Sequence, residues 1–399
     1  MKVLILSCNT GEGHNSCAKA LQESLSKKEI TCDIVDSLQF ISPLISALMA
    51  KSHVFLYRNL PALFDWGYRF AERYPSLYRK GSPIYAFLAI GAKKLAIYIN
   101  EGGYDAIVCA HVFSGVMMTE AKTLCERTIL TSLFATDYTC SPITDASDLD
   151  IYFIADEKVG DQFIKKGIDA ERLVPVGIPI RSGFYTHMSK TDAKVAEGIA
   201  SEHRHLVIMC GSMGCGPIEK IVRRISGQLY EDMEMTVVCG NNKKLCEKLT
   251  ALQNEDPKIH IRGYVQNISR LMDSADVYLT KPGGISVTEA SVKRIPMVLV
   301  NAVGGCERYN YAFFTENGTA KSGKTVDALI GQCLDLLDQP GTREQIRRLY
   351  EESVLCNAAE EIPIHLIHAH EKKVQYFDDE TEKMDTTEPK QEEKLLHEG

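Results

Sequence analysis

The sequence predicts an α/β protein made of two Rossmann-like domains that face each other across a cleft. Apolar runs and helical patterns alternate through most of the 399 residues, which is typical of parallel sheets covered by helices. Two of these runs, one in each half, lead into a glycine-rich turn and then a helix. We therefore expect an N-terminal domain over residues 1–183 and a C-terminal domain over residues 184–370.

The alternation also predicts individual strands. The expected strands of the two domains are 2–7, 31–36, 105–110, 128–135, 150–155 and 173–177, then 205–210, 235–239, 259–263, 276–281 and 297–301. A glycine- and proline-punctuated segment, 177–183, separates the two sets, and the polar stretch 187–204 reads as a connection. Residues 371–399 contain ten acids against five lysines and few apolar residues, so we expect a disordered acidic tail.

Composition restricts the class of protein. The chain is 45% apolar, as globular proteins are, and no apolar stretch approaches the roughly 20 residues of a membrane span. Its net charge of −8 argues against nucleic acid as a partner. Thirteen cysteines are scattered without any Cys-x-x-Cys pair, and the first apolar run is too short for a signal peptide. These features favour a cytoplasmic protein with reduced thiols.

The most informative stretch follows the expected strand at 276–281. Gly283 and Gly284 lead into a helix, which places unpaired N–H groups and the positive helix end where a phosphate could bind. Glu289 lies one turn after Ile285, so its carboxylate can accept hydrogen bonds from ribose hydroxyls of the same ligand. The pattern predicts a nucleotide site. Alternatively, it is a buried strand–helix corner with Glu289 on a solvated face.

A related element opens the chain. The strand at 2–7 is followed by the turn TGEG (10–13) and a helix that begins at His14. This is not a Gly-x-Gly-x-x-Gly loop, because Ser16 occupies the third glycine position. The positive end of a helix disfavours imidazolium, so His14 should stay neutral near pH 7 and could act as a general base. Its other reading is a helix cap.

Further motifs follow in a fixed order along the chain. They are TGEGH (10–14), GIPI (177–180), GSMG (211–214), VCGNN (238–242), GYVQN (263–267), TKPGG (280–284) and GGCERYN (304–310). In these motifs the chain resembles the monogalactosyldiacylglycerol synthase and processive diacylglycerol glucosyltransferase family, over roughly residues 1–340. The resemblance implies the GT-B fold, with the donor nucleotide on the C-terminal domain and the acceptor on the N-terminal domain.

The resemblance also implies an activity, a hexosyltransferase reaction. Galactose or glucose would move from a UDP-sugar to diacylglycerol or a glycosyl-diacylglycerol, with inversion, in glycolipid synthesis. His14 would be the base, and the end of the helix after Gly284 would stabilise the departing diphosphate without a metal. The implied donor-binding residues are Gly211, Ser212, Met213, Gly263, Tyr264, Val265, Gly283, Gly284, Ile285, Ser286, Glu289, Glu307 and Asn310. The implied acceptor side of the cleft contains Gly13, Asp137 and His111.

One departure from the family pattern bears on the acceptor. Many members have a histidine a few residues after the Thr-Asp pair that is here Thr136 and Asp137, whereas this chain continues with YTCSP. Asp137 stays a polar partner in the cleft, and His111 could supply an imidazole or be a satisfied core histidine. Two other functions therefore remain open: a UDP-sugar enzyme with another lipid-linked acceptor, and a UDP-sugar-binding sensor without transferase activity.

Asp148 and Asp150 form an Asp-x-Asp pattern that other glycosyltransferases use for Mg²⁺ or Mn²⁺. The pair precedes an expected strand and would therefore lie opposite the edge where ligands gather. We expect solvated acids there and no metal site.

The segment 51–94 is unusually basic and aromatic. It contains eight Lys or Arg against two acids, with aromatic residues interleaved. Trp66, Arg69, Arg73 and Arg79 on amphipathic helices would suit an anionic membrane surface, and an enzyme acting on a lipid must reach a bilayer. We expect peripheral association with the inner face of the cell membrane. The alternative is a packed helical subdomain with solvated cations.

Overall fold

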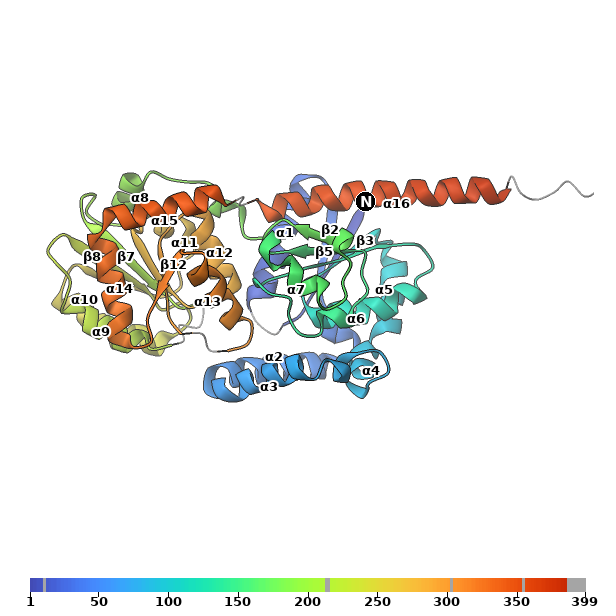
Figure 1. The fold of residues 1–399 in the computed structure, drawn as a ribbon, viewed down its shortest axis with the longest axis horizontal. Coiled ribbons are helices and arrows are strands. Elements are labelled where there is room, and N and C mark those ends of the chain that lie inside the picture. The colour runs from blue at the N-terminus through green and yellow to red at the C-terminus, as the bar shows by residue number, and fades with distance from the viewer. Residues whose placement is uncertain (10–11, 212–215, 302–303, 354–355, 386–399) are drawn as a thin grey trace, which may run out of the picture.

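Two parallel sheets, each with helices packed on its faces, form the two halves of the protein (Figure 1). The computed structural model describes residues 1–9, 12–211, 216–301, 304–353 and 356–385. Within them the first sheet has the strand order β2-β1-β3-β4-β5-β6, and the second has the order β12-β11-β10-β7-β8-β9. All of these strand pairs are parallel.

The described strands of the first sheet are β1 Lys2–Ser7, β2 Thr31–Asp36, β3 Ala106–Cys109, β4 Leu130–Phe134, β5 Ile151–Ile154 and β6 Leu173–Pro175. Those of the second are β7 Arg204–Met209, β8 Met233–Val238, β9 Ile259–Arg262, β10 Val277–Thr280, β11 Met297–Leu299 and β12 Ala320–Ser322. The central strands are apolar over their whole length because helices cover both faces of each sheet. All expected strands are confirmed. Only β12 was not predicted.

The helices of the N-terminal half are α1 Glu12–Lys27, α2 Pro43–Asn59, α3 Pro61–Arg73, α4 Pro83–Ala89, α5 Ala92–Gly102, α6 Val112–Ala121 and α7 Gly160–Ile164. Those that follow are α8 Lys190–Ala196, α9 Ile218–Ser226, α10 Lys243–Glu255, α11 Ile268–Ser274, α12 Gly284–Val292, α13 Glu307–Glu316, α14 Val326–Asp338, α15 Pro340–Glu352 and α16 Ala358–Asp385. The first sheet ends with β6 and the second begins with β7, so the expected boundary after residue 183 falls in the connection between them.

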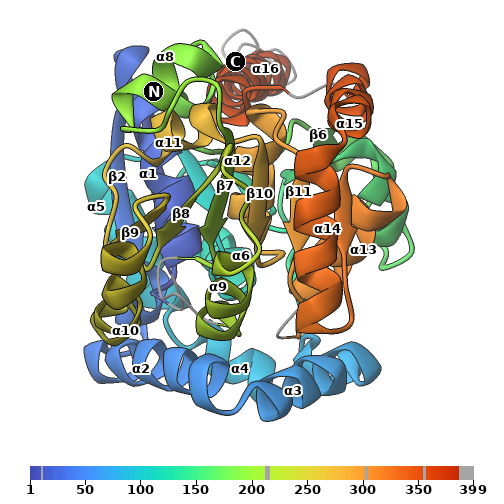
Figure 2. The same cartoon turned by 90° about the vertical axis from the view of Figure 1, so that its left-hand side faces the viewer.

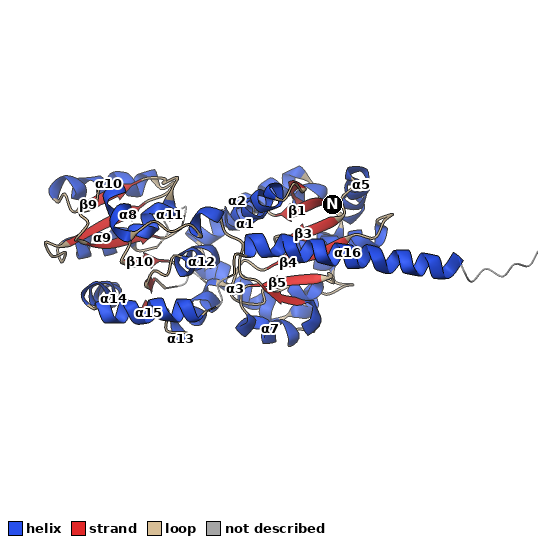
Figure 3. Ribbon diagram, turned by 90° about the horizontal axis from the view of Figure 1, so that it is seen from above, coloured by secondary structure: helices blue, strands red, loops and turns tan. Residues whose placement is uncertain are grey.

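The last helix, α16, corrects the expected end of the C-terminal domain. It crosses back and packs on α1 and β4 of the N-terminal sheet, as seen from above in Figure 3. Its early residues Ile362 and Leu366 are buried, and Lys373 bonds to Asp150 at 2.8 Å. The domain assignment of residues 358–370 is therefore wrong: they belong with the N-terminal half.

The expected disordered tail also begins too early. The helix continues through residue 371 to Asp385, although acidic composition predicted no structure there. A reason is visible at the start of this stretch, where Lys373 is held by Ile129 O and by the carboxylate of Asp150. Residues 386–399 lie outside the described residues.

Both sheets reverse their strand order near the middle, and both reversals face the cleft. In the first sheet β1 lies between β2 and β3, and in the second β7 lies between β8 and β10. Loops at the carboxyl ends of strands on either side of such a reversal diverge and leave a crevice for ligands. The glycine turns predicted from the sequence follow β1, β7 and β10, so they meet at these two crevices.

Helices α2 and α3 form a hairpin that extends below both halves (Figures 1 and 2). Proline at the first turn and the Ser42 side chain, which accepts from the N–H of Leu44, start α2. Proline also starts α3 directly after α2, so the two helices follow one another with only Leu60 between them. In the part of the chain that the structure describes, no single helix has the length and apolar composition of a membrane span. The bent pair formed by residues 75–89 and 92–102 passes that test by length and composition.

Candidate active site in the interdomain cleft

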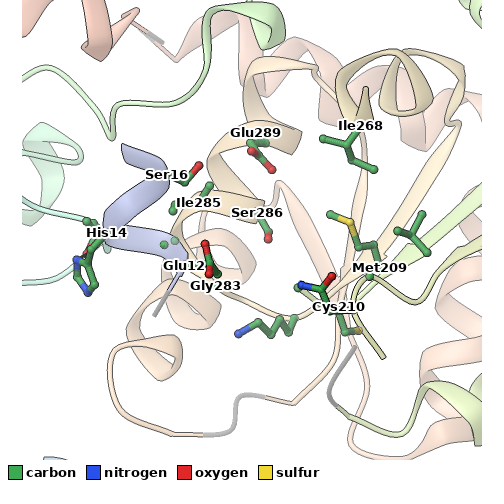
Figure 4. A pocket seen from close by; sticks show the side chains of 18 of the residues that line it. Glu12, His14, Ser16, Met209, Cys210, Ile268, Gly283, Ile285, Ser286 and Glu289 are labelled. Atoms are coloured by element: carbon green, nitrogen blue, oxygen red, sulfur yellow. Dashed lines mark hydrogen bonds between the residues drawn. The ribbon is translucent and has the colours of Figure 1, made fainter. Parts of the chain in front are cut away.

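A cavity of about 610 Å³ lies between the two sheets, at the carboxyl ends of their central strands. Figure 4 shows residues from both halves around it, with His14 and Ser16 from α1 facing Ser286 and Glu289 from α12. Its lining residues are Glu12, Gly13, His14, Ser16, Lys19, His53, Val54, Tyr57, Thr136, Asp137, Arg181, Met209, Cys210, Gly211, Val238, Gly240, Asn241, Tyr264, Val265, Ile268, Lys281, Gly283, Gly284, Ile285, Ser286 and Glu289. Most residues predicted for the donor site are therefore brought together.

His14 is oriented by the neighbouring strand of its own sheet. Its Nδ1 lies 2.7 Å from the carbonyl oxygen of Ala110, at the end of β3. A carbonyl oxygen only accepts, so Nδ1 donates and the lone pair of the neutral ring is on Nε2. Burial lowers the pKa of His14 to about 4, against the opposing effect of the bond to Ala110, and His53 lowers it further. His14 is thus neutral at physiological pH, as a proton acceptor must be.

His111 supports this ring and does not line the cavity. Its Nδ1 accepts the N–H of Phe113 at 3.1 Å, so it caps the start of α6. The His111 ring meets the His14 ring edge-on with centroids 4.8 Å apart. Burial lowers the pKa of His111 well below its ordinary value, and the nearby His14 adds to this effect. Of its two readings, the geometry favours a buried histidine that positions its neighbour.

Asp137 lies in the cleft and is shared between the domains. Its Oδ1 accepts from Nδ2 of Asn310, on α13 of the other half, at 2.7 Å. Asn310 also accepts the N–H of Tyr138 at 2.7 Å and donates to Pro282 O at 3.0 Å. Asn310 is fully buried and does not line the cavity, so its contacts join the two domains behind the donor loop.

The start of α12 faces the N-terminal domain at very short range. A Cβ on Gly284 would overlap the carbonyl oxygen of Thr136, and one on Gly13 would lie 3.3 Å from Ile285. Glycine at these two positions therefore lets the domains approach. The first N–H groups of α12 have no partner inside the helix and lie at the cavity, beside Gly283. This is the anion-binding geometry that the sequence predicted.

The main cation of the donor loop, Lys281, was not singled out from the sequence. Its Nζ lies 2.8 Å from Oε1 of Glu307 and 2.7 Å from the hydroxyl of Tyr57, which comes from α2. Burial lowers the pKa of Lys281, but Glu307 and Tyr57 outweigh it and the net pKa is raised. Lys281 is therefore charged, and its Cε lies 2.8 Å from where a Cβ on Gly211 would be. The signal was a lysine directly before the Pro-Gly-Gly turn.

Glu289 is the buried carboxyl group of the cavity, 6% exposed. Burial raises its pKa to about 7, and the charge of Arg181 partly opposes this effect. Arg181 comes from the connection between the domains, lines the same cavity, and was not predicted as a site residue. A half-protonated buried carboxyl with an adjacent guanidinium suits a ligand that brings hydroxyl donors.

The remaining predicted donor residues are placed as follows. Tyr264 and Val265 line the cavity at the far side of the C-terminal sheet, while Gly263 does not line it. Glu307 acts on the cavity through Lys281. Ser212 and Met213 lie outside the described residues.

Asp148 and Asp150 lie at the opposite edge of the N-terminal sheet. Asp148 pairs with Lys122 at 3.1 Å and with Arg172 at 2.6 Å, and Asp150 pairs with Lys373. Each aspartate is thus committed to cations of the protein. Within the described ranges, no group of three or more His, Cys, Asp or Glu side chains could hold a metal ion.

The predicted membrane residues lie on the outer surface of the α2–α3 hairpin and beyond it. Trp66 is 62% exposed and stacks on Phe70 at a centroid distance of 5.5 Å. Arg69 pairs with Asp65 along the helix, and Arg79 lies 3.8 Å from Asp145. These arginines are more than half exposed, so their charge reaches the solvent.

Comparisons with known proteins agree with this geometry. Residues 14–180 match the model of the monogalactosyldiacylglycerol (MGDG) synthase family, and residues 205–328 match that of the glycosyltransferase family 28 C-terminal domain. The processive diacylglycerol beta-glucosyltransferase of Bacillus subtilis (strain 168) is 28% identical over 366 residues, which cover 90% of this chain and 93% of that protein. The enzyme of the same name from Bacillus cereus (strain AH187) is 28% identical over 80% of this chain and 81% of its own length.

Solved structures show the same fold at low sequence identity. MurG of Acinetobacter baumannii superposes with a TM-score of 0.62 at 13% identity, covering 92% of this chain and 99% of that one. Anabaena Alr3699/HepE, solved in complex with UDP, gives a TM-score of 0.51 at 13% identity, over 95% and 99% of the two chains. The two-sheet arrangement is the GT-B fold. With both of its halves matched, the chain belongs to the monogalactosyldiacylglycerol synthase and processive diacylglycerol glucosyltransferase family.

Proposed function

We propose that the protein is an inverting glycosyltransferase that moves a hexose from a UDP-sugar to the hydroxyl of diacylglycerol or a glycosyl-diacylglycerol. One observation supports this reaction above all others. A neutral imidazole with a free Nε2 lies on one wall of the cleft, and the positive end of α12 lies on the other. Displacement at an anomeric carbon needs a proton acceptor for the attacking hydroxyl and stabilisation of the departing diphosphate, on opposite sides of the sugar.

The donor fits the C-terminal wall in one direction. Glu289 would accept hydrogen bonds from the ribose hydroxyls, and Val265 would lie along the uracil. The diphosphate would meet the first N–H groups of α12 and the ammonium of Lys281, next to Gly211. The hexose would then extend toward Asp137 and His14. In its UDP complex, HepE shares only the fold with this chain, so these roles rest on the local chemistry described above.

We infer that the donor diphosphate is held without a metal ion. Lys281 and the end of α12 already supply positive charge at its expected position. A bound Mg²⁺ would need carboxylate oxygens at that place. The nearest candidate, Glu307, is paired with Lys281.

The acceptor would reach His14 from the side of the α2–α3 hairpin. His53, Val54 and Tyr57 on the inner side of α2 line the cavity, while Phe55 on its other side is 57% exposed. A lipid whose chains stay in the bilayer could therefore present its hydroxyl to the cavity past a single helix. This geometry supports peripheral binding to an anionic membrane, at the inner face of the cell membrane in an intact cell.

The function can be tested with the full-length protein, diacylglycerol in detergent micelles, and UDP-glucose or UDP-galactose in separate reactions. We expect a monohexosyl-diacylglycerol, whose anomeric configuration can be read by NMR. Transfer to another lipid-linked acceptor, with none to diacylglycerol, would favour the alternative suggested by Tyr138 at the position after Asp137. UDP-sugar binding without transfer to any acceptor would indicate a sensor.

A further inference from the structure

The α2–α3 hairpin belongs to the N-terminal half of the chain but contacts the donor-binding half. Asp65 accepts the N–H of Gly305 at 3.1 Å and pairs with Arg308 at 3.2 Å. Glu72 accepts the hydroxyl of Tyr309 at 2.5 Å and also pairs with Arg308. These contacts place α3 across the outer mouth of the cleft, as Figure 2 shows.

One hairpin residue reaches the donor loop itself. The hydroxyl of Tyr57 donates to Oε1 of Glu307 at 2.7 Å and accepts from Nζ of Lys281 at 2.7 Å. The ammonium of Lys281 also lies 4.7 Å from the centre of the Tyr57 ring. Lys281 is thereby fixed beside Gly211, between the two loops that would hold the diphosphate. The donor site is complete only while the hairpin is in this position.

The hairpin is held on the protein by contacts that are weak in water. Within α3 no residue is fully buried. Its links to α13 are mainly ion pairs with partly exposed side chains, such as Asp65–Arg308 and Glu72–Arg308. Exposed ion pairs contribute little to stability because water solvates both partners. A surface that bound the other side of the hairpin would therefore shift its position easily.

The outward side of the hairpin has the chemistry of a bilayer-binding surface. Leu44, Leu48, Phe55 and Trp66 are between 57% and 81% exposed. On α3, Trp66 and Phe70 point away from Asp65 and Glu72, which face α13. Exposed aromatic and aliphatic side chains flanked by arginines are typical of helices that lie in the interface of an anionic bilayer.

We infer that Tyr57 is a positioning residue through which binding of the hairpin to a lipid bilayer strengthens donor binding. This inference rests on the proposed function and adds a coupling to it. The bilayer holds the hairpin against the C-terminal domain, and Tyr57 then holds Lys281 where the diphosphate binds. Coupling between two sites is reciprocal, so UDP must strengthen bilayer binding by the same factor.

The test compares UDP affinity with and without vesicles of phosphatidylcholine and phosphatidylglycerol that contain no diacylglycerol. For the full-length protein we expect the Kd for UDP to fall about 5-fold or more when vesicles are added. In Tyr57→Phe, which keeps the ring and loses the hydroxyl, the vesicle effect should disappear while cosedimentation with vesicles persists. Tyr85→Phe is the matched control, because the hydroxyl of Tyr85 binds Glu120 inside the N-terminal half. It should retain the full effect.

Two results would overturn the coupling. One is an equal vesicle effect in Tyr57→Phe and the unaltered protein. The other is an unaltered protein that sediments with vesicles and shows no change in UDP affinity. Failure of the proposed function would look different, since it would appear as no transfer to diacylglycerol in detergent micelles, where there is no bilayer.

Discussion

Replacing Glu289 with glutamine should stabilise the protein at pH 8 while weakening its binding of UDP. The folded protein raises the pKa of this carboxyl from 4.5 to about 7, and burial is the main cause. A difference of roughly 2.5 pKa units at about 1.36 kcal/mol per unit corresponds to ~3 kcal/mol. This is the free energy of unfolding that the ionised side chain costs, because charge is removed from water without a full partner.

The sign follows from proton binding. Between pH 4.5 and about 7, the folded state binds more protons at Glu289 than the unfolded state does. The contribution of this residue is therefore fully present below pH 4.5 and is lost as the pH rises through about 7. Glutamine resembles the protonated acid at every pH. Glu289→Gln should be more stable than the unaltered protein by ~3 kcal/mol at pH 8 and by less than about 1 kcal/mol at pH 5.

Urea unfolding of both proteins across this pH range measures the difference directly. Glu307→Gln is a suitable control, since Glu307 is equally buried but paired with Lys281. Its loss leaves a buried cation without its partner, so this variant should be less stable at pH 8. A Glu289→Gln difference that does not change with pH, or a variant less stable at pH 8, would refute the proposed cause.

The same carboxyl links UDP binding to protons. If ribose hydroxyls donate to the carboxylate of Glu289, UDP favours the ionised form and must release a proton when it binds near pH 6.5. Calorimetry in buffers of different ionisation enthalpy should detect about three quarters of a proton per UDP. In Glu289→Gln the release should vanish and the UDP affinity should fall. Equal proton release in the two proteins would remove Glu289 from the ribose site.

Three further predictions concern catalysis, metal and membrane. His14→Ala should lower hexose transfer by about 10²–10⁴-fold with little change in UDP affinity, as steady-state kinetics and calorimetry can show; transfer at the original rate would exclude His14 as the base. EDTA should leave transfer largely intact, whereas an absolute need for Mg²⁺ or Mn²⁺ would contradict the role given to α12 and Lys281. Charge reversal at Arg69, Arg73 and Arg79, or high salt, should reduce cosedimentation with anionic vesicles but not UDP binding in their absence. Equal binding to neutral and anionic vesicles would contradict the electrostatic part.

The sheets could be predicted from sequence because their central strands are buried on both faces. A run such as Lys2–Ser7 is apolar almost throughout, and no other short element of a globular protein needs that pattern. The exception, β12, has three residues at a sheet edge and exposes Lys321, so no run was visible. Helix α16 was misjudged at both ends. Composition cannot show that an acidic segment continues a helix whose first turns dock on another domain.

The site was predictable where its residues are neighbours in the chain. The turn with Gly283 and Gly284 and the carboxyl of Glu289 lie within one strand–turn–helix unit, and that unit alone determines their relative positions. The partner of His14 was not predictable, because Ala110 meets it only through the pairing of β1 with β3. Arg181 likewise enters the cavity from the connection between domains.

The hairpin shows the limit of reading one segment at a time. Composition gave residues 51–94 two readings, a membrane-binding surface or a packed subdomain, and the structure supports features of both. Trp66 is exposed on one side of α3, while Tyr57 on α2 is bonded to residues more than 200 positions away in the chain. Amphipathic helices normally pack one side and solvate the other. Here the packed side faces the donor pocket, so a surface suited to lipid and a site suited to UDP are two sides of the same pair of helices.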